Sequence, residues 1–136
     1  MVIIAALSAV AVPRFSGALL HYRADATARR IVAALELARA EAFRTSKSQT
    51  VQFVIASNEV RFSEILDPDN SGQSYVFRLD EAPYRARLLS ATFGPGSNAV
   101  FDPYGEPVNA GTVVFEAGGM QKTIALNATS GKATVQ

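Results

Sequence analysis

The chain has 136 residues, a formal net charge of +1 and 18% charged residues, and it contains no cysteine. A chain of this length allows one domain, or one domain with a stalk. The weak net charge excludes a broad electrostatic surface for nucleic acid or anionic lipid, and the lack of thiols excludes a disulfide scaffold and a thiolate metal site.

The first twelve residues carry no charge and only one hydroxyl, and Pro13 and Arg14 end this apolar run. A helix that crosses a bilayer needs about 20 apolar residues. We therefore expect a crossing helix with further apolar residues upstream, or the core of a signal peptide, which the run matches less well because no basic segment precedes it. Pro13 is expected to bend the helix, and the residues expected to contact lipid and neighbouring helices are Val2, Ile3, Ile4, Leu7, Val10 and Val12.

From Arg14 to Ser46 there is no proline, and apolar residues recur at steps of three and four. This spacing places them on one face of a helix. We predict one continuous helix that meets lipid first and a protein core later, with residues 1–23 as membrane anchor and stalk and residues 24–136 as the globular domain. The side chains expected to pack this helix on a sheet are Ile31, Val32, Leu35, Ala38 and Ala42.

Beyond residue 48 the pattern becomes that of short strands separated by turn residues. The expected strands are residues 50–56, 59–65, 75–79, 86–93, 100–101, 112–116, 122–127 and 133–136. A helix followed by seven or eight strands predicts an α+β fold, in which an antiparallel sheet buries one face against the amphipathic half of the helix.

Residues 67–73 are all turn-forming, and Asp67, Asp69 and Ser71 place oxygen atoms at alternate positions with glycine sixth, as a calcium loop does. The twelfth position is Arg78, where a calcium loop has a bidentate glutamate. Two interpretations remain open, a weak calcium site or a plain Asx turn. No other cofactor is expected.

The sequence offers no catalytic group. His21 is the only histidine, lies in the stalk region and has no second ligand four residues later. No histidine lies in the globular part to act as the base for a serine nucleophile such as Ser130. We therefore predict a protein that is not an enzyme.

The apolar run ending at residues 9–15, the helical segment 38–42 and the C-terminal segments 100–107, 112–116 and 124–132 resemble type IV pilins and type II secretion pseudopilins. They resemble in particular the H-type minor pseudopilins and FimT-type minor pilins of the GspH/FimT family. The resemblance implies a pilin-like fold and a non-catalytic minor pseudopilin that assembles through its N-terminal helix. The implied location is the bacterial inner membrane, crossed once, with the globular domain in the periplasm. The implied partners are other pseudopilin or pilin subunits, the inner membrane, and prepilin peptidase if the precursor has a leader.

Two departures from the family pattern limit what the resemblance implies. The basic leader, the processing-site glycine, and the phenylalanine and glutamate that follow it do not precede Met1, so processing and the glutamate contact are assigned to no residue. The alternative function is that of a FimT-like minor pilin in pilus assembly or DNA uptake. DNA is the less supported partner, because the segment after Gly131 has one cation, Lys132, where DNA-binding relatives have arginines.

Overall fold

The computed structural model describes residues 2–70, 72–81 and 84–136, and for residues 2–19 it describes the backbone alone. A helix, α1 (Val2–Thr45), is followed within these residues by eight strands. The strands are β1 (Gln49–Val54), β2 (Glu59–Leu66), β3 (Ser74–Arg78), β4 (Ala86–Phe93), β5 (Asn98–Phe101), β6 (Gly111–Ala117), β7 (Met120–Leu126) and β8 (Ala133–Val135).

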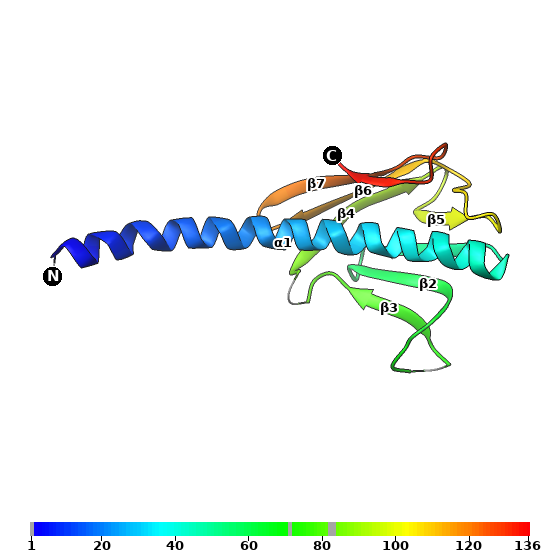
Figure 1. The fold of residues 1–136 in the computed structure, drawn as a ribbon, viewed down its shortest axis with the longest axis horizontal. Helices are drawn as coiled ribbons and strands as arrows, with labels where there is room; N and C mark the ends of the chain where they lie inside the picture. The colour runs from blue at the N-terminus through cyan, green and yellow to red at the C-terminus, as the bar shows by residue number, and fades with distance from the viewer. Residues whose placement is uncertain (1, 71, 82–83) are drawn as a thin grey trace.

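Helix α1 has 44 residues, which corresponds to a length of about 66 Å. It continues through Pro13 and ends at Thr45, where Ser46 takes a left-handed conformation with φ of 54°. Figure 1 shows the C-terminal half of α1 lying along the strands and the N-terminal part extending beyond them. The predicted continuous helix is therefore present, and its two parts have different neighbours.

The strands form two antiparallel sheets, ordered β3-β2-β1-β5 and β4-β6-β7-β8. The predicted α+β class, with the helix packed on antiparallel sheet structure, is confirmed. The expectation of one sheet is wrong. Strand β5 pairs with β1, with Thr50 opposite Val100, and β4 pairs with β6 instead of with β5, the next strand in the sequence. Pairings between such distant segments leave no local pattern in the sequence.

The hairpins follow the predicted turns. In β1–β2, Val54 faces Glu59 across the turn that contains Ser57 and Asn58. In β6–β7, Ala117 faces Met120, and both intervening glycines have positive φ, as a tight two-residue turn requires. Gly118 is also restricted by space, because a Cβ there would lie 2.7 Å from a methyl carbon of Leu20.

The core lies where α1 meets the two sheets. Of the predicted packing residues, Ile31, Leu35, Ala38 and Ala42 are buried, and Val32 is half-buried against the same core. The other buried helix residues are small, and they are Ala24, Thr27, Ala28 and Ala34. Small side chains let the sheets approach the helix closely. The sheets fill the space with large rings, which are Phe53, Phe62, Phe93, Phe101 and Phe115.

Asn58 joins the two sheets. Its backbone has a positive φ of 55°, and its carbonyl oxygen accepts a hydrogen bond from the amide of Leu79 at 2.8 Å. Its side-chain oxygen accepts a second, from the amide of Leu88 in β4, also at 2.8 Å. The turn between β1 and β2 therefore caps the free edge of β4 in the second sheet.

Candidate assembly surface

The side of α1 opposite the core carries a regular row of seven residues, which we call the outward face. Its members follow one another at alternating steps of four and three, and they are Tyr22, Ala26, Arg29, Ala33, Glu36, Ala40 and Phe43. All are exposed except the half-buried Ala26, and the aromatic residues at the two ends are 59% and 70% exposed. Exposed aromatic side chains on a charged helix are typical of contact surfaces.

A shallow groove lies beside each half of the outward face. The first, of about 350 Å³, is bounded by Arg30 and by Tyr84 from the loop before β4. The second, of about 360 Å³, is bounded by Arg39 and by Tyr104 and Gly105 from the loop after β5. Arg30 and Arg39 are nine residues apart, half a revolution round a helix, so the grooves open on opposite sides of the row.

The loop after β5 reaches the helix because position 105 is glycine. Its φ is +79°, and a Cβ there would lie 3.1 Å from the carbonyl oxygen of Arg39 and 3.4 Å from the Cβ of Phe43. Tyr104, 79% exposed, is thereby held beside Phe43. Sequence reasoning missed this contact, although the turn residues on either side of Gly105 indicated a loop.

The residues predicted for lipid and bundle contacts all lie in the part of α1 whose backbone alone is described. Val2, Ile3, Ile4, Leu7, Val10, Val12 and Pro13 are helical, and their side chains lie outside the described part of the chain. Their roles stay predictions, as does the bend at Pro13. In the part of the chain that the structure describes, no helix combines the length and apolarity needed to cross a bilayer.

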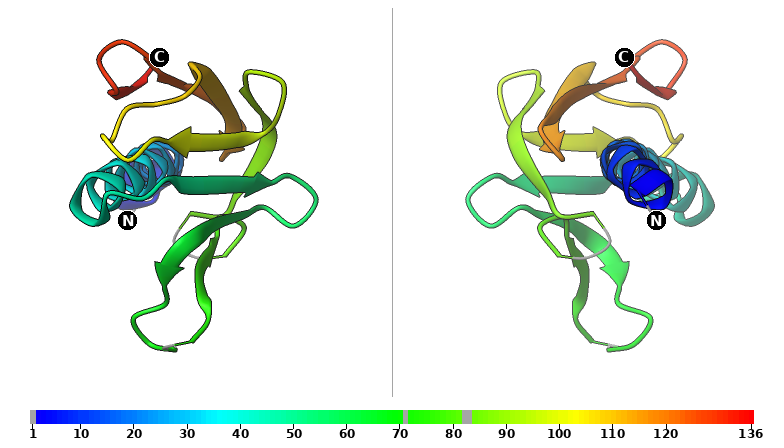
Figure 2. Two further views of the ribbon diagram at one scale, coloured as in Figure 1. Left: turned by 90° about the vertical axis from the view of Figure 1, so that its right-hand side faces the viewer. Right: turned by 90° about the vertical axis from the view of Figure 1, so that its left-hand side faces the viewer.

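The β2–β3 hairpin projects as an arm from the rest of the domain (Figure 2). Its base is held on α1 by Arg30, whose guanidinium carbon lies 3.9 Å from the centre of the Phe77 ring. The same guanidinium donates a hydrogen bond to the Tyr75 hydroxyl, and the Tyr75 ring stacks on Phe62 at 5.3 Å between centres. Sequence reasoning missed Arg30, although the alternation of Tyr75 and Phe77 placed both rings on one face of β3.

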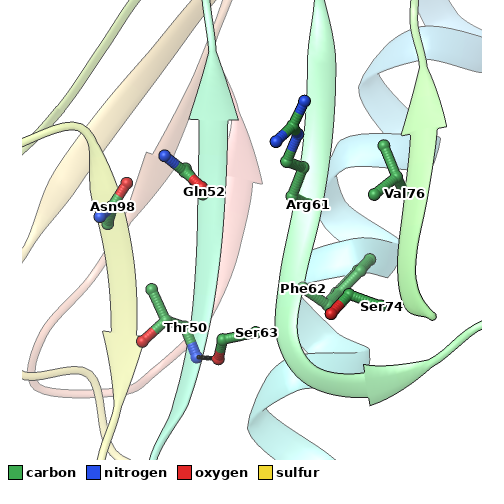
Figure 3. Close-up of a pocket in the computed structure, with 8 residues that line it drawn as sticks. All are labelled: Thr50, Gln52, Arg61, Phe62, Ser63, Ser74, Val76 and Asn98. Carbon is green, nitrogen blue, oxygen red and sulfur yellow. Dashed lines mark hydrogen bonds between the residues drawn. The ribbon is translucent and has the colours of Figure 1, made fainter. Parts of the chain in front are cut away.

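A groove of about 330 Å³ lies on the outer face of the first sheet (Figure 3). Between the Arg61–Val76 pair and the Leu66–Ser74 pair, four residues of β2 lie opposite a single residue of β3, Tyr75. This bulge separates the two strands and opens the groove. Uncharged polar groups dominate its lining, with Thr50, Gln52, Ser63, Ser74 and Asn98 beside Arg61, Phe62 and Val76. This lining can exchange hydrogen bonds with a polar partner.

Arg61 in this groove is held by Glu59. Two guanidinium nitrogens of Arg61 donate to one carboxylate oxygen of Glu59, at 2.6 and 2.9 Å. This hydrogen bonding lowers the pKa of Glu59 below its usual value, and the positive charge of Arg61 acts in the same direction. The pair makes the rim of the groove electrically balanced.

The predicted calcium loop is closed by its own hydrogen bonds. A carboxylate oxygen of Asp67 accepts from the Asp69 amide at 2.9 Å, and the Asp67 amide donates to the Gln73 carbonyl at 2.9 Å. Ser71 lies outside the described residues. Elsewhere, across the described ranges, no three acidic or histidine side chains are grouped as a metal site needs. The calcium site stays a hypothesis, and the Asp67 carboxylate serves as the acceptor of an Asx turn.

The C-terminal turn before β8 rests on the helix. Gly131 has a φ of +72°, and a Cβ there would lie 3.1 Å from the guanidinium carbon of Arg39. The structure thus brings Arg39 close to the segment that contains Lys132, although Arg39 and Gly131 are 92 positions apart in the sequence. Together the two residues provide two cations here, fewer than a site that follows a DNA backbone requires.

Solved structures that share this fold include a minor pseudopilin and a minor pilin. The minor pseudopilin EpsH from the type 2 secretion system of Vibrio cholerae matches with a TM-score of 0.61 and 17% identity, over 84% of this chain and 96% of that one. The type IV minor pilin FimU of Pseudomonas aeruginosa matches in two crystal forms at 13% identity. The TM-scores are 0.56 and 0.55, over 82% of this chain and 87% and 91% of those chains.

No curated protein sequence matches the chain. The model of the family described as "Type II transport protein GspH" matches residues 27–130, from the packed half of α1 to the turn before β8. This range is about three quarters of the chain and includes β1 to β7. The chain therefore belongs to the GspH family of type II transport proteins, which are minor pseudopilins with a pilin-like fold.

Proposed function

We propose that this chain is a non-catalytic minor pseudopilin of a type II secretion system, anchored once in the bacterial inner membrane with its globular domain in the periplasm. It assembles with other pseudopilin subunits through α1. If the precursor carries a leader, prepilin peptidase removes it before assembly. The observation that carries the proposal is the family match over residues 27–130. The extension of α1 beyond the sheets adds to it (Figure 1).

The mechanism follows from the apolar character of the first part of α1. In the bilayer its side chains contact lipid tails, and in a filament they contact neighbouring helices. Both surroundings are apolar, so transfer from one to the other changes the free energy of burial little. A near-balanced exchange of this kind allows a motor to extract subunits from the membrane into a filament.

Deletion of the gene tests the proposal in the bacterium that encodes this chain. We expect loss of release of the proteins that the type II system exports, and recovery when the full chain is restored. Cross-linking in the restored strain should join the chain to other pseudopilins. Normal export in the deletion strain would contradict the proposal.

The same deletion strain distinguishes the alternative function, that of a FimT-like minor pilin, from the proposed one. A FimT-like minor pilin would leave export intact and reduce surface pili or uptake of DNA. A gel shift with duplex DNA at low salt adds a direct measurement, because a backbone-tracking site binds more weakly as salt rises. We expect no salt-sensitive binding.

A further inference from the structure

The first of the two grooves beside the outward face is lined by two arginines and no acidic residue. We call it the basic groove, and its lining is Tyr22, Ala26, Arg29, Arg30, Ala33 and Tyr84. Neither arginine has an ion-pair partner among the described residues. The groove therefore presents two guanidinium groups, beside two tyrosines, to a negatively charged partner.

The guanidinium of Arg30 is held in place before any partner binds. Its carbon lies 3.9 Å from the centre of the Phe77 ring, and it donates a hydrogen bond to the Tyr75 hydroxyl. A guanidinium has more N–H donors than this bond uses, so donors remain for a carboxylate. An arginine that is already ordered loses less conformational entropy on binding. The exposed Arg29 supplies the second charge.

The tip of the arm carries the opposite charge. Residues 62–77 contain three carboxylates, those of Glu64, Asp67 and Asp69, and no lysine or arginine. None of the three has an ion-pair partner among the described residues, and Glu64 and Asp69 are exposed. We call residues 64–70 the acidic tip. The arm points away from α1 of its own molecule (Figure 2), so the tip faces a different molecule.

Anionic lipid is another partner that two arginines attract, and the position of the groove argues against it. Arg29 lies 17 residues beyond Val12, where the apolar run ends, which corresponds to about 25 Å along a helix. The headgroup layer of a bilayer is about 5–8 Å thick on each side. The basic groove therefore lies beyond the headgroups when the first part of α1 crosses the membrane upright.

The tip and the groove lie at different heights along α1. Figure 1 shows the segment between β2 and β3 level with the C-terminal part of α1, whereas the basic groove lies beside residues 22–33. Two copies with parallel helices therefore bring tip and groove together only if one copy is displaced along the helix axis. Because the contact uses two different surfaces, it can repeat from copy to copy.

We propose that the acidic tip of one copy of this chain binds in the basic groove of a second copy, where its carboxylates pair with Arg29 and Arg30. The proposal rests on the proposed function, because parallel helices follow from anchoring in one membrane. The contact is made by the arm, so it is separate from contacts between apolar helix segments. Exposed charge pairs add little affinity, and their role here is to select the partner surface and the displacement.

Cysteine cross-linking tests the proposal in the full chain, because the native sequence has no cysteine. A tip version, Asn70→Cys with a size tag, and a groove version, Ala33→Cys without one, are produced together in bacterial membranes that lack other pseudopilins. With a short bifunctional thiol reagent we expect a mixed dimer joined between positions 33 and 70. Ala40→Cys replaces the groove version as the matched control, because Ala40 is also exposed on the outward face and does not line the basic groove. It should give no mixed dimer.

Charge reversal identifies the pairing groups. Arg29→Glu in the groove version turns an attraction into a repulsion and should lower the yield of mixed dimer at least about fivefold. Asp69→Arg in the tip version should then restore the yield. Lys47→Glu in the groove version makes the same change of net charge at an exposed residue outside the groove, and should leave the yield unchanged. Arg29 is exposed, so the variant should melt like the parent.

Three results would overturn the proposal: no mixed dimer, an equal yield with Ala40→Cys, or no recovery with Asp69→Arg. If Arg29→Glu instead weakens retention on anionic vesicles and not on zwitterionic ones, lipid is the partner of the groove. Export in the restored strain measures the proposed function separately. Normal recovery of export without the dimer would remove only the tip and groove contact, and a dimer without recovery of export would remove only the proposed function.

Discussion

The two parts of α1 share one backbone and have different surroundings. Residues 20–45 lie against both sheets and place the buried Ile31 and Leu35 in the core. Residues 2–19 continue the same helix beyond the strands (Figure 1). The helix is a structural element of the globule in its second part and extends beyond the strands in its first, so equal substitutions should act differently in the two parts.

The largest contrast is expected between Leu35→Asp and Leu7→Asp. Leu35 is 1% exposed, and an unpaired carboxylate at that position should cost at least about 4 kcal/mol, a large part of the stability of a small domain. Thermal unfolding should show loss of the cooperative transition for Leu35→Asp. Leu7→Asp should melt like the parent and be retained less in membranes. Equal melting of the two variants would contradict the division of the helix.

Gly118 tests where the packed part begins, because Leu20 fills the space beside it. Gly118→Ala adds a Cβ 2.7 Å from a Leu20 methyl at a residue with positive φ, and should destabilise by about 1–3 kcal/mol. Gly119→Ala is the matched control, since its φ is also positive and the space around it is open; it should cost about 1 kcal/mol. Chemical denaturation measures both, and equal losses would show that Leu20 does not pack there.

Asn58 tests whether the packed part of α1 depends on two joined sheets. Asn58→Gly retains access to the positive φ and removes the side-chain oxygen that caps the Leu88 amide. The loss should be about 1–2 kcal/mol, the cost of one unpaired backbone amide. Asn98→Ala, at an exposed position in β5, is the control. Stability unchanged in Asn58→Gly would show that the sheets hold together without this bond.

The smallest effect is expected from the Glu59–Arg61 pair on the arm, in which Arg61 is exposed and Glu59 is half-buried. The pKa of Glu59 is lowered by its hydrogen bond to Arg61, so the folded state holds this proton less tightly than the unfolded chain. The pair therefore contributes stability above the unfolded pKa, and the contribution is lost as the pH falls through the lowered folded pKa. Glu59→Gln should slightly reduce the acid sensitivity of the melting temperature. A larger acid sensitivity in the variant would contradict this sign.

Local patterns were sufficient to predict the helix, the hairpins and four of the helix residues in the core. The three-and-four spacing identified Ile31, Leu35, Ala38 and Ala42, and the turn residues located the β1–β2, β6–β7 and β7–β8 hairpins. The resemblance based on the apolar run and the C-terminal strands agreed with the family match. These features depend on residues close together in the chain.

Contacts between distant segments could not be predicted. Pairing of β5 with β1 separates the strands into two sheets, and the contacts of Arg30 with Phe77 and of Arg39 with Gly131 join residues 47 and 92 positions apart. The outward face was missed for another reason. Its alanines appear apolar in sequence, and only the position of the core shows that they lie on the opposite side of the helix.

Amide hydrogen exchange of the full chain, measured in buffer and in phospholipid vesicles, reports whether the two parts of α1 have different surroundings. A segment of this length without tertiary contacts is a marginal helix in water, whereas a packed helix resists exchange. We predict slow exchange for residues 24–45 in both conditions, and slow exchange for residues 2–19 in vesicles only. Equal protection of residues 2–19 in buffer, or no added protection in vesicles, would contradict a helix that changes its surroundings along its length.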